Sequence, residues 1–213
     1  LYALGIYLDA LEKQIVFLHD QKEVRFSQWL RREDMSLEEF QDADRDHCDT
    51  LERIYPRYFR YPFIISLWAV FESAIKEASE YIASNKGVTK ELREMNGGVL
   101  KRTEQYFDNV LGFVLYKDDS YKNCIRELYQ IRNFIAHNNG RLEFNEENEK
   151  TKFNKLLNER NGLSIVSGCL VLEESYLRNS YSLMNEILTD LITRIRHEWK
   201  TIKVKKNLNV SIE

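Results

Sequence analysis

The sequence predicts an all-α protein, a helical bundle with one small β-hairpin insertion. The 213 residues include only 8 glycines and 2 prolines, which are too few for the turns of a β-sandwich. Apolar residues recur at helical spacing over most of the chain. We expect a single domain over residues 1–213, with an N-terminal helical extension (1–55), a core bundle (56–200) and a basic tail (201–213).

The first half of the chain predicts a helical pair followed by a central helix. Residues 2–33 carry a helical apolar stripe made of Leu4, Leu8, Leu11, Ile15 and Leu18. Ser36 is placed to cap a second, shorter helix. Pro56 and Pro62 interrupt the next stretch, and a broad apolar stripe from Phe63 to Ile82, Tyr81 included, predicts a helix buried on more than one side.

The second half predicts three further helices and the hairpin. An amphipathic segment runs from Leu100 to Leu111, and a helix begins near Asp118 and stops at Asn138-Asn139-Gly140. The charged segment 146–160 is expected as an exposed helix, and residues 163–172 as a hairpin around Ser167-Gly168. A last long helix is expected over residues 173–200.

Composition and missing motifs exclude several classes of function. A net charge of −3 argues against a histone-like polycation, and the longest apolar run, 63–71, is far shorter than the ~20 residues that cross a membrane. The three cysteines lie far apart, which fits a reducing cytoplasm. The four histidines lack a second ligand at metal-binding spacing, and the sequence contains no nucleotide-binding glycine motif. We expect no metal and no cofactor.

The densest polar cluster is the segment 129–141, around Arg132 and His137. A guanidinium offers a planar set of donors to phosphate oxygens, and an imidazole gains or loses a proton near neutral pH. Together they can cut RNA without a metal: the imidazole moves the proton of the ribose 2′-hydroxyl or of the leaving 5′-oxygen, and the guanidinium stabilises charge at phosphorus. Asn133 adds an amide that can hold a phosphate oxygen or the imidazole.

Helical geometry constrains this site, because five residues rotate by about 140° around an ideal helix. We expect the helix to unwind near Ala136 and two copies to face each other across a two-fold axis. Tyr129, Asn138 and Arg141 are the candidate RNA-binding residues. A packed tyrosine is the more frequent role for Tyr129, and a helix cap the more frequent one for Asn138.

The segment Arg132-Asn133-Phe134-Ile135-Ala136-His137-Asn138, inside an all-helical chain, resembles the Arg-x4–6-His motif of the HEPN superfamily. The resemblance implies a homodimeric, metal-independent endoribonuclease whose products end in 2′,3′-cyclic phosphate. Arg132 and His137 match the catalytic pair and Asn133 the polar position between them. A toxin or antiphage defence effector is implied, with RNA as substrate and an antitoxin such as a nucleotidyltransferase as a candidate partner. The N-terminal helices and the hairpin depart from the compact HEPN toxins.

Other interpretations of the same residues stay open. Some HEPN proteins are non-catalytic modules that bind a nucleotide, RNA or protein, and a regulatory subunit or antitoxin is a third possibility. A purely structural pair is a further alternative, with His137 favoured by the helix dipole and Arg132 bound to Glu127 or another carboxylate. The basic residues Arg194, Arg196, Lys200, Lys203, Lys205 and Lys206 either guide RNA by long-range attraction or form a solvated helix end.

Overall fold

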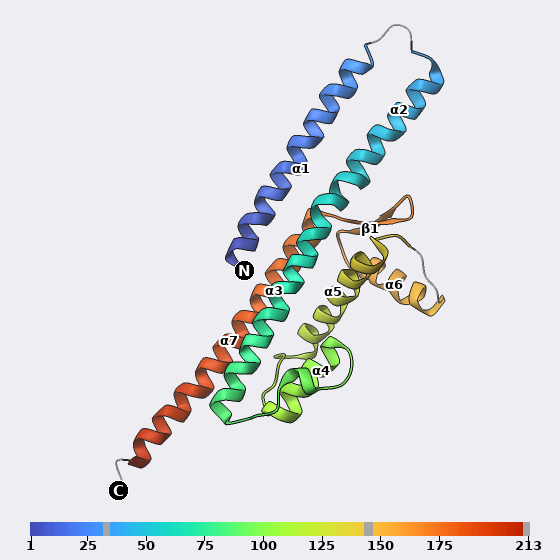
Figure 1. Ribbon diagram of the computed structural model, residues 1–213. Coiled ribbons are helices and arrows are strands. Elements are labelled where there is room, and N and C mark those ends of the chain that lie inside the picture. Colours follow the sequence, from blue (N-terminus) through green and yellow to red (C-terminus); the bar gives the residue numbers. More distant parts are fainter. Residues whose placement is uncertain (32–34, 143–146, 211–213) are drawn as a thin grey trace. The chain divides into compact units, whose positions relative to one another are not determined.

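The computed structural model describes residues 1–31, 35–142 and 147–210, leaving out the side chains of residues 147–149, 152, 159 and 200–210. Helices dominate this part of the chain, and a two-stranded sheet completes it, so the predicted all-α fold with a small hairpin is confirmed (Figure 1). The elements are α1 (Tyr2–Trp29), α2 (Leu37–Asp49), α3 (Tyr55–Lys86), α4 (Val99–Gln105), α5 (Asp119–Asn138), α6 (Glu147–Glu159), β1 (Leu163–Val166), β2 (Cys169–Leu172) and α7 (Glu174–Val210).

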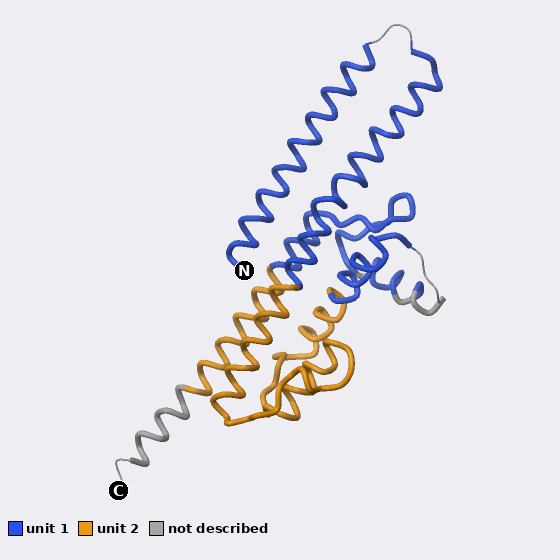
Figure 2. The backbone as a smooth tube through the Cα atoms, in the orientation of Figure 1, with its two compact units in different colours: residues 1–68, 129–181 blue, residues 69–128, 182–213 orange. Residues whose placement is uncertain are grey.

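The chain forms two compact units, each built from two separate segments (Figure 2). Unit 1 contains residues 1–68 and 129–181, and unit 2 contains residues 69–128 and 182–213. The expectation of one domain with limits after residues 55 and 200 stays a prediction.

In unit 1, α1 and α2 form the expected helical pair (Figure 1). The Oγ atom of Ser36 accepts a hydrogen bond from the backbone N–H of Glu39 at 3.2 Å, and the Glu39 carboxylate accepts one from the backbone N–H of Ser36 at 2.8 Å. This capping box satisfies donors that the first turn of α2 leaves without helical partners, so the predicted cap is confirmed.

The buried face of α1 includes a carboxylate, Glu12, beside Leu8, Leu11 and Ile15. Both oxygens of Glu12 accept hydrogen bonds from Arg60, at 2.9 and 2.7 Å, and a third donor of Arg60 reaches the carbonyl of Leu172 at 2.7 Å. A buried charge is tolerated only when it is paired and hydrogen-bonded. The Arg60 side chain therefore ties α1, α3 and β2 together within unit 1.

The prolines do not interrupt the chain as expected. A π-helical turn over Thr50–Ile54 joins α2 to α3, and α3 begins at Tyr55 and continues through Pro62. Each proline removes one helical hydrogen bond because it lacks an N–H. The π-helical turn already shifts the pattern of backbone hydrogen bonds just before Pro56. Beside Pro62, the fully buried side chains of Phe63 and Ile64 keep the backbone helical. The free energy gained by burying these side chains exceeds the cost of the backbone hydrogen bonds that the prolines remove.

The hairpin of unit 1 has the predicted position. Leu163 pairs with Leu172 and Val166 with Cys169, leaving a two-residue turn. Both turn residues have positive φ, 49° at Ser167 and 71° at Gly168, as a type I′ turn requires.

Unit 2 has an aromatic and aliphatic core drawn from the second half of α3, from α4 and its following turn, and from α7. Phe107 and Leu111 lie on a π-helical turn after α4 and are fully buried. Lys86 donates to the carbonyl of Leu111 at 2.9 Å and pairs with Glu198 at 3.1 Å. Tyr81, a residue of the predicted apolar stripe, is 51% exposed instead of buried.

Helix α7 continues beyond the predicted end at residue 200, to Val210. Within it, Arg194 donates to the carbonyl of Leu115 at 2.8 Å and pairs with Asp190 at 2.8 Å, so this basic residue, one of those considered for guiding RNA, contacts the core of unit 2. The side chains of Lys200, Lys203, Lys205 and Lys206 lie outside the described part of the chain.

Candidate functional site

Arg132 lies on α5 as a half-buried residue. Its Nη1 donates to Oδ1 of Asn133 at 2.9 Å, while its buried Nε has no hydrogen-bond partner among the described residues. The expected alternative of an ion pair with Glu127 or another carboxylate is not formed with any residue that the structure describes. The guanidinium is thus oriented by a neutral amide and keeps its charge.

His137 is exposed near the end of α5. The expected unwinding near Ala136 is wrong, because α5 stays helical to Asn138. On an unbroken helix, Arg132 and His137 lie about 140° apart around the axis. One chain therefore does not bring the two side chains to the same face of α5.

The helix ends at the predicted cap. Asn139 and Gly140 have φ values of 49° and 69°, and the backbone N–H of Arg141 donates to the carbonyl of Asn138 at 2.9 Å. This left-handed turn satisfies a carbonyl that the last turn of α5 would leave unpaired. The backbone of Asn138 therefore takes part in the cap, and the role of its side chain in RNA binding stays a prediction.

The turn after α5 is fastened to β2 and α3. The backbone N–H of Leu170 donates to the carbonyl of Gly140 at 2.8 Å, and the Tyr61 hydroxyl donates to the carbonyl of Leu170. Arg57 donates through Nη2 to the carbonyl of Asn139 at 2.6 Å. Burial raises the pKa of Tyr61 to about 12, which keeps this hydroxyl a donor at physiological pH.

These contacts border a groove of about 620 Å³ in unit 1. Three arginines and two tyrosines line it with apolar residues, and none of the described lining residues is Asp or Glu; the cations and rings are Arg53, Arg57, Arg141, Tyr58 and Tyr61. A cleft of this size and mixed character is typical of a ligand site.

The arginines of the groove differ in how their charge is compensated. Arg53 makes a two-point contact with Asp49, and this hydrogen-bonded pair lowers the pKa of the Asp49 carboxyl. Neither Arg57 nor Arg141 forms an ion pair within the described ranges. The groove therefore keeps positive charge at Arg57 and Arg141.

Helical geometry relates this groove to Arg132. Ile135 and Ala136, which line the groove, follow Arg132 by three and four residues, so the three positions share a face of α5. Arg132 lies one turn, about 6 Å, beyond Ala136 along the helix axis. His137 does not line the groove.

Of the two remaining residues predicted to bind RNA, one packs inside the protein and the other lines the groove. Tyr129 is half-buried and packs on Trp68 with 5.0 Å between ring centroids, whereas Arg141 is exposed and lines the groove. Sequence reasoning missed Arg53, Arg57 and Tyr58. The signal that could have found them is the alternation of basic and aromatic residues in Arg53-Ile54-Tyr55-Pro56-Arg57-Tyr58.

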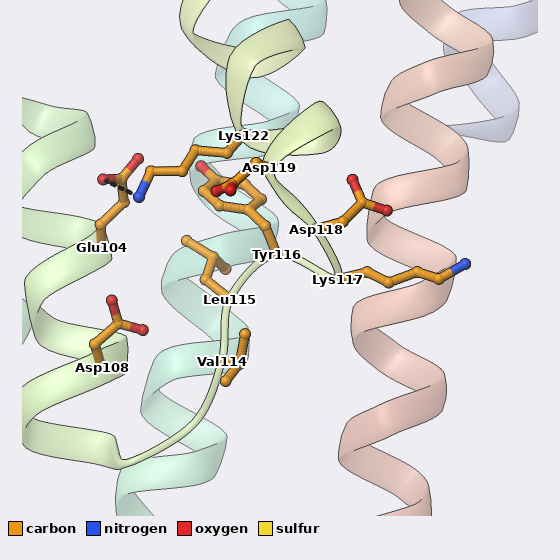
Figure 3. A pocket seen from close by; sticks show the side chains of 9 residues that line it. All are labelled: Glu104, Asp108, Val114, Leu115, Tyr116, Lys117, Asp118, Asp119 and Lys122. Atoms are coloured by element: carbon orange, nitrogen blue, oxygen red, sulfur yellow. Dashed lines mark ion pairs between the residues drawn. The ribbon is translucent and has the colours of Figure 1, made fainter.

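A second pocket, of about 270 Å³, lies in unit 2 (Figure 3). Its charged residues are Glu104, Asp108, Asp118 and Asp119 with Lys117 and Lys122. Lys122 reaches Glu104 at 3.4 Å, while Lys117 extends away from that pair (Figure 3). Among the described residues, no group of three or more His, Cys, Asp or Glu is placed to hold a metal ion.

No known protein family, curated protein or solved structure matches the chain. The resemblance to the HEPN superfamily therefore stays a prediction from the motif. None of the helices in the described part of the chain is long and apolar enough to span a membrane.

Proposed function

We propose that the protein is a metal-independent endoribonuclease of HEPN type with a composite active site at a homodimer interface. The observation that carries the proposal is Arg132, a half-buried guanidinium oriented by Asn133 and free of any carboxylate among the described residues. Such a group is suited to bind a phosphate and to stabilise the charge that develops on it.

The reaction needs only groups of the substrate and of the chain. The ribose 2′-oxygen attacks phosphorus, its proton passes to a base, and the 5′-oxygen leaves with a proton. His137 carries out the proton transfers and Arg132 stabilises the phosphorane charge. The products are a 2′,3′-cyclic phosphate and a 5′-hydroxyl.

A second copy resolves the divergence of the two side chains. Arg132 and His137 lie on different faces of an unbroken α5, so a site that contains both takes Arg132 from one chain and His137 from its two-fold partner. The cellular role that fits such an enzyme is a cytoplasmic toxin or defence effector, with an antitoxin such as a nucleotidyltransferase as its neutralising partner.

Mixing two inactive variants tests the shared site. Bulk RNA is incubated with protein in EDTA, and wild type is expected to release cyclic-phosphate ends while Arg132→Ala and His137→Ala do not. If the subunits of the two variants exchange, half of the dimers are mixed and one of their two sites is complete, so activity returns to at most about a quarter of wild type. Sites contained within one chain would give no recovery.

His19→Ala is the matched control, because His19 is also an exposed helical histidine, and circular dichroism checks that every variant is folded. Wild type that leaves RNA intact after long incubation rejects the enzyme.

One observation favours a second candidate, a non-catalytic RNA-binding module: the groove that carries the positive charge does not include His137. Bound but uncut RNA would support it. An antitoxin or regulatory subunit is separated by expression in cells, where an active ribonuclease arrests growth and Arg132→Ala does not.

A further inference from the structure

We infer that the groove of unit 1 is a binding site for single-stranded RNA, in which Tyr58 stacks on a base and Arg57 and Arg141 bind phosphates. The inference rests on the proposed function, because it names where the substrate of that site is held. The base-stacking role expected of Tyr129, whose ring is packed against Trp68, is assigned here to Tyr58 of α3.

The charge of the groove favours a polyanion. Arg57 donates one hydrogen bond to the carbonyl of Asn139, and this bond positions the guanidinium without cancelling its charge. Its buried Nε has no partner among the described residues, and the side chain of Arg141 has none either. Both cations line the groove, and no Asp or Glu stands among its lining residues in the part of the chain that the structure describes, so a phosphate is attracted by each arginine and repelled by none of those residues.

Tyr58 supplies the aromatic surface. It lies on α3 and is 75% exposed. Stacking of bases on exposed aromatic side chains is the main sequence-tolerant contribution to binding of single strands. Tyr61, one turn later, is buried beneath the guanidinium of Arg57, 5.7 Å from its ring centroid, and so supports the arginine.

The apolar part of the groove fits the same ligand. Ile54, Ile65 and Ile135 line it beside the arginines, which offers an apolar surface for a base or ribose next to charges for the phosphates. An acidic peptide would use the arginines equally well, but its carboxylates offer no aromatic ring that could stack on Tyr58. The combination of ring and cations therefore favours RNA over an acidic protein partner.

The groove also leads toward the proposed catalytic arginine. Because Arg132 continues the face of α5 that lines the groove, about 6 Å beyond Ala136, a strand held at Tyr58 and Arg141 extends toward Arg132. The groove thus holds nucleotides that flank the cleaved linkage.

Binding is tested with a fluorescein-labelled 2′-O-methyl oligonucleotide, which has no free 2′-hydroxyl and stays uncut. Tyr58→Ala is expected to weaken binding about tenfold at every salt concentration, and Tyr58→Phe to preserve it. Arg141→Gln is expected to weaken binding and to reduce the slope of log affinity against log salt by about 0.7, as expected for one lost phosphate contact.

Tyr2→Ala and Arg25→Gln are the matched controls, because both residues are exposed on α1 and do not line the groove. They are expected to bind as wild type does. Unchanged affinity of Tyr58→Ala, an unchanged slope for Arg141→Gln, or tight binding of labelled poly-glutamate that ignores Tyr58→Ala each overturns the inference.

The outcomes separate the two proposals. If wild type cuts RNA and both groove variants bind and cut RNA as wild type does, the inferred RNA-binding groove is wrong and the proposed endoribonuclease activity is supported. If the oligonucleotide binds through Tyr58 and Arg141 but natural RNA is never cut, the proposed endoribonuclease activity is wrong and the inferred RNA-binding groove is supported.

Discussion

The groove of unit 1 and the pocket of unit 2 differ in the partners of their cations. In the pocket, Lys122 pairs with the carboxylate of Glu104 at 3.4 Å, and Arg126, which is not a lining residue, pairs with the same carboxylate at 2.9 Å. In the groove, Arg57 contacts a backbone carbonyl instead. A carboxylate cancels a positive charge, whereas a carbonyl orients the guanidinium and leaves its charge in place. Counting arginines and lysines therefore does not locate an anion site; their partners do.

The largest expected difference between the two regions concerns glycines with positive φ. In unit 1, a Cβ atom on Gly140 would lie 1.9 Å from the Tyr61 hydroxyl, whereas in unit 2 a Cβ on Gly112 would meet nothing within 4 Å. Gly140→Ala adds overpacking to left-handed strain and is expected to cost about 3 kcal/mol. Gly112→Ala carries the strain alone and costs about 1 kcal/mol.

Urea unfolding of the two glycine variants measures this difference. Hydrogen exchange adds a local readout, since the amide of Leu170, which bonds to Gly140, is expected to lose protection only in Gly140→Ala. Equal costs for the two substitutions would show that the turn after α5 is not held as described.

A tyrosine in each region gives the next comparison. The Tyr61 hydroxyl donates to the carbonyl of Leu170, while the hydroxyl of the buried Tyr116 forms no hydrogen bond with a described residue. Tyr61→Phe leaves a buried carbonyl with one partner fewer and is expected to cost about 1.5 kcal/mol. Tyr116→Phe is expected to change stability by less than about 0.5 kcal/mol. Thermal or urea unfolding decides, and a larger loss for Tyr116→Phe would contradict the assignment.

Charge reversal tests whether the groove alone attracts RNA. Arg141→Glu is expected to weaken binding of the uncut oligonucleotide about tenfold, because it replaces an attraction by a repulsion in the groove. Lys117→Glu makes the same change on an exposed residue of the acidic pocket and is expected to leave affinity unchanged. Fluorescence anisotropy measures both, and equal losses would point to the net charge of the protein instead of to the groove.

Local signals in the sequence predicted local structure well. The Ser36 cap, the turn at Ser167-Gly168 and the end of α5 at Asn138 each depend on a few neighbouring residues whose hydrogen bonds or backbone angles are set within one turn. The same is true of the helical spacing that predicted α5 and α7.

The errors arose where distant residues compete with local preference. Pro62 was expected to stop a helix, yet the buried Phe63 and Ile64 keep α3 continuous. Tyr81 follows the apolar period but is exposed, because periodicity does not say how wide the covered face is.

The candidate site was predicted only in part for the same reason. Arg132, Asn133 and Arg141 stand in one short polar segment, 129–141, which is visible in the sequence. The groove requires the packing of α3 beside the end of α5 in unit 1, which brings Arg57 to the carbonyl of Asn139, a residue 82 positions away. No local pattern encodes that contact.

The smallest expected effect concerns the one arginine of the groove whose charge is neutralised. The hydrogen-bonded contact with Arg53 lowers the pKa of Asp49 in the folded protein below its ordinary value of about 3.9. The pair therefore stabilises the fold above pH 4, and that stability is lost as the pH falls through the lowered pKa. Asp49→Asn, whose amide does not titrate, is expected to be less stable than wild type by up to about 1 kcal/mol at pH 7, with the gap closing below pH 4. Urea unfolding across this range checks the sign.

Because the substitution also frees the charge of Arg53, it is expected to tighten binding of the oligonucleotide slightly, and weaker binding by a folded variant would show that Arg53 does not contribute to the field of the groove.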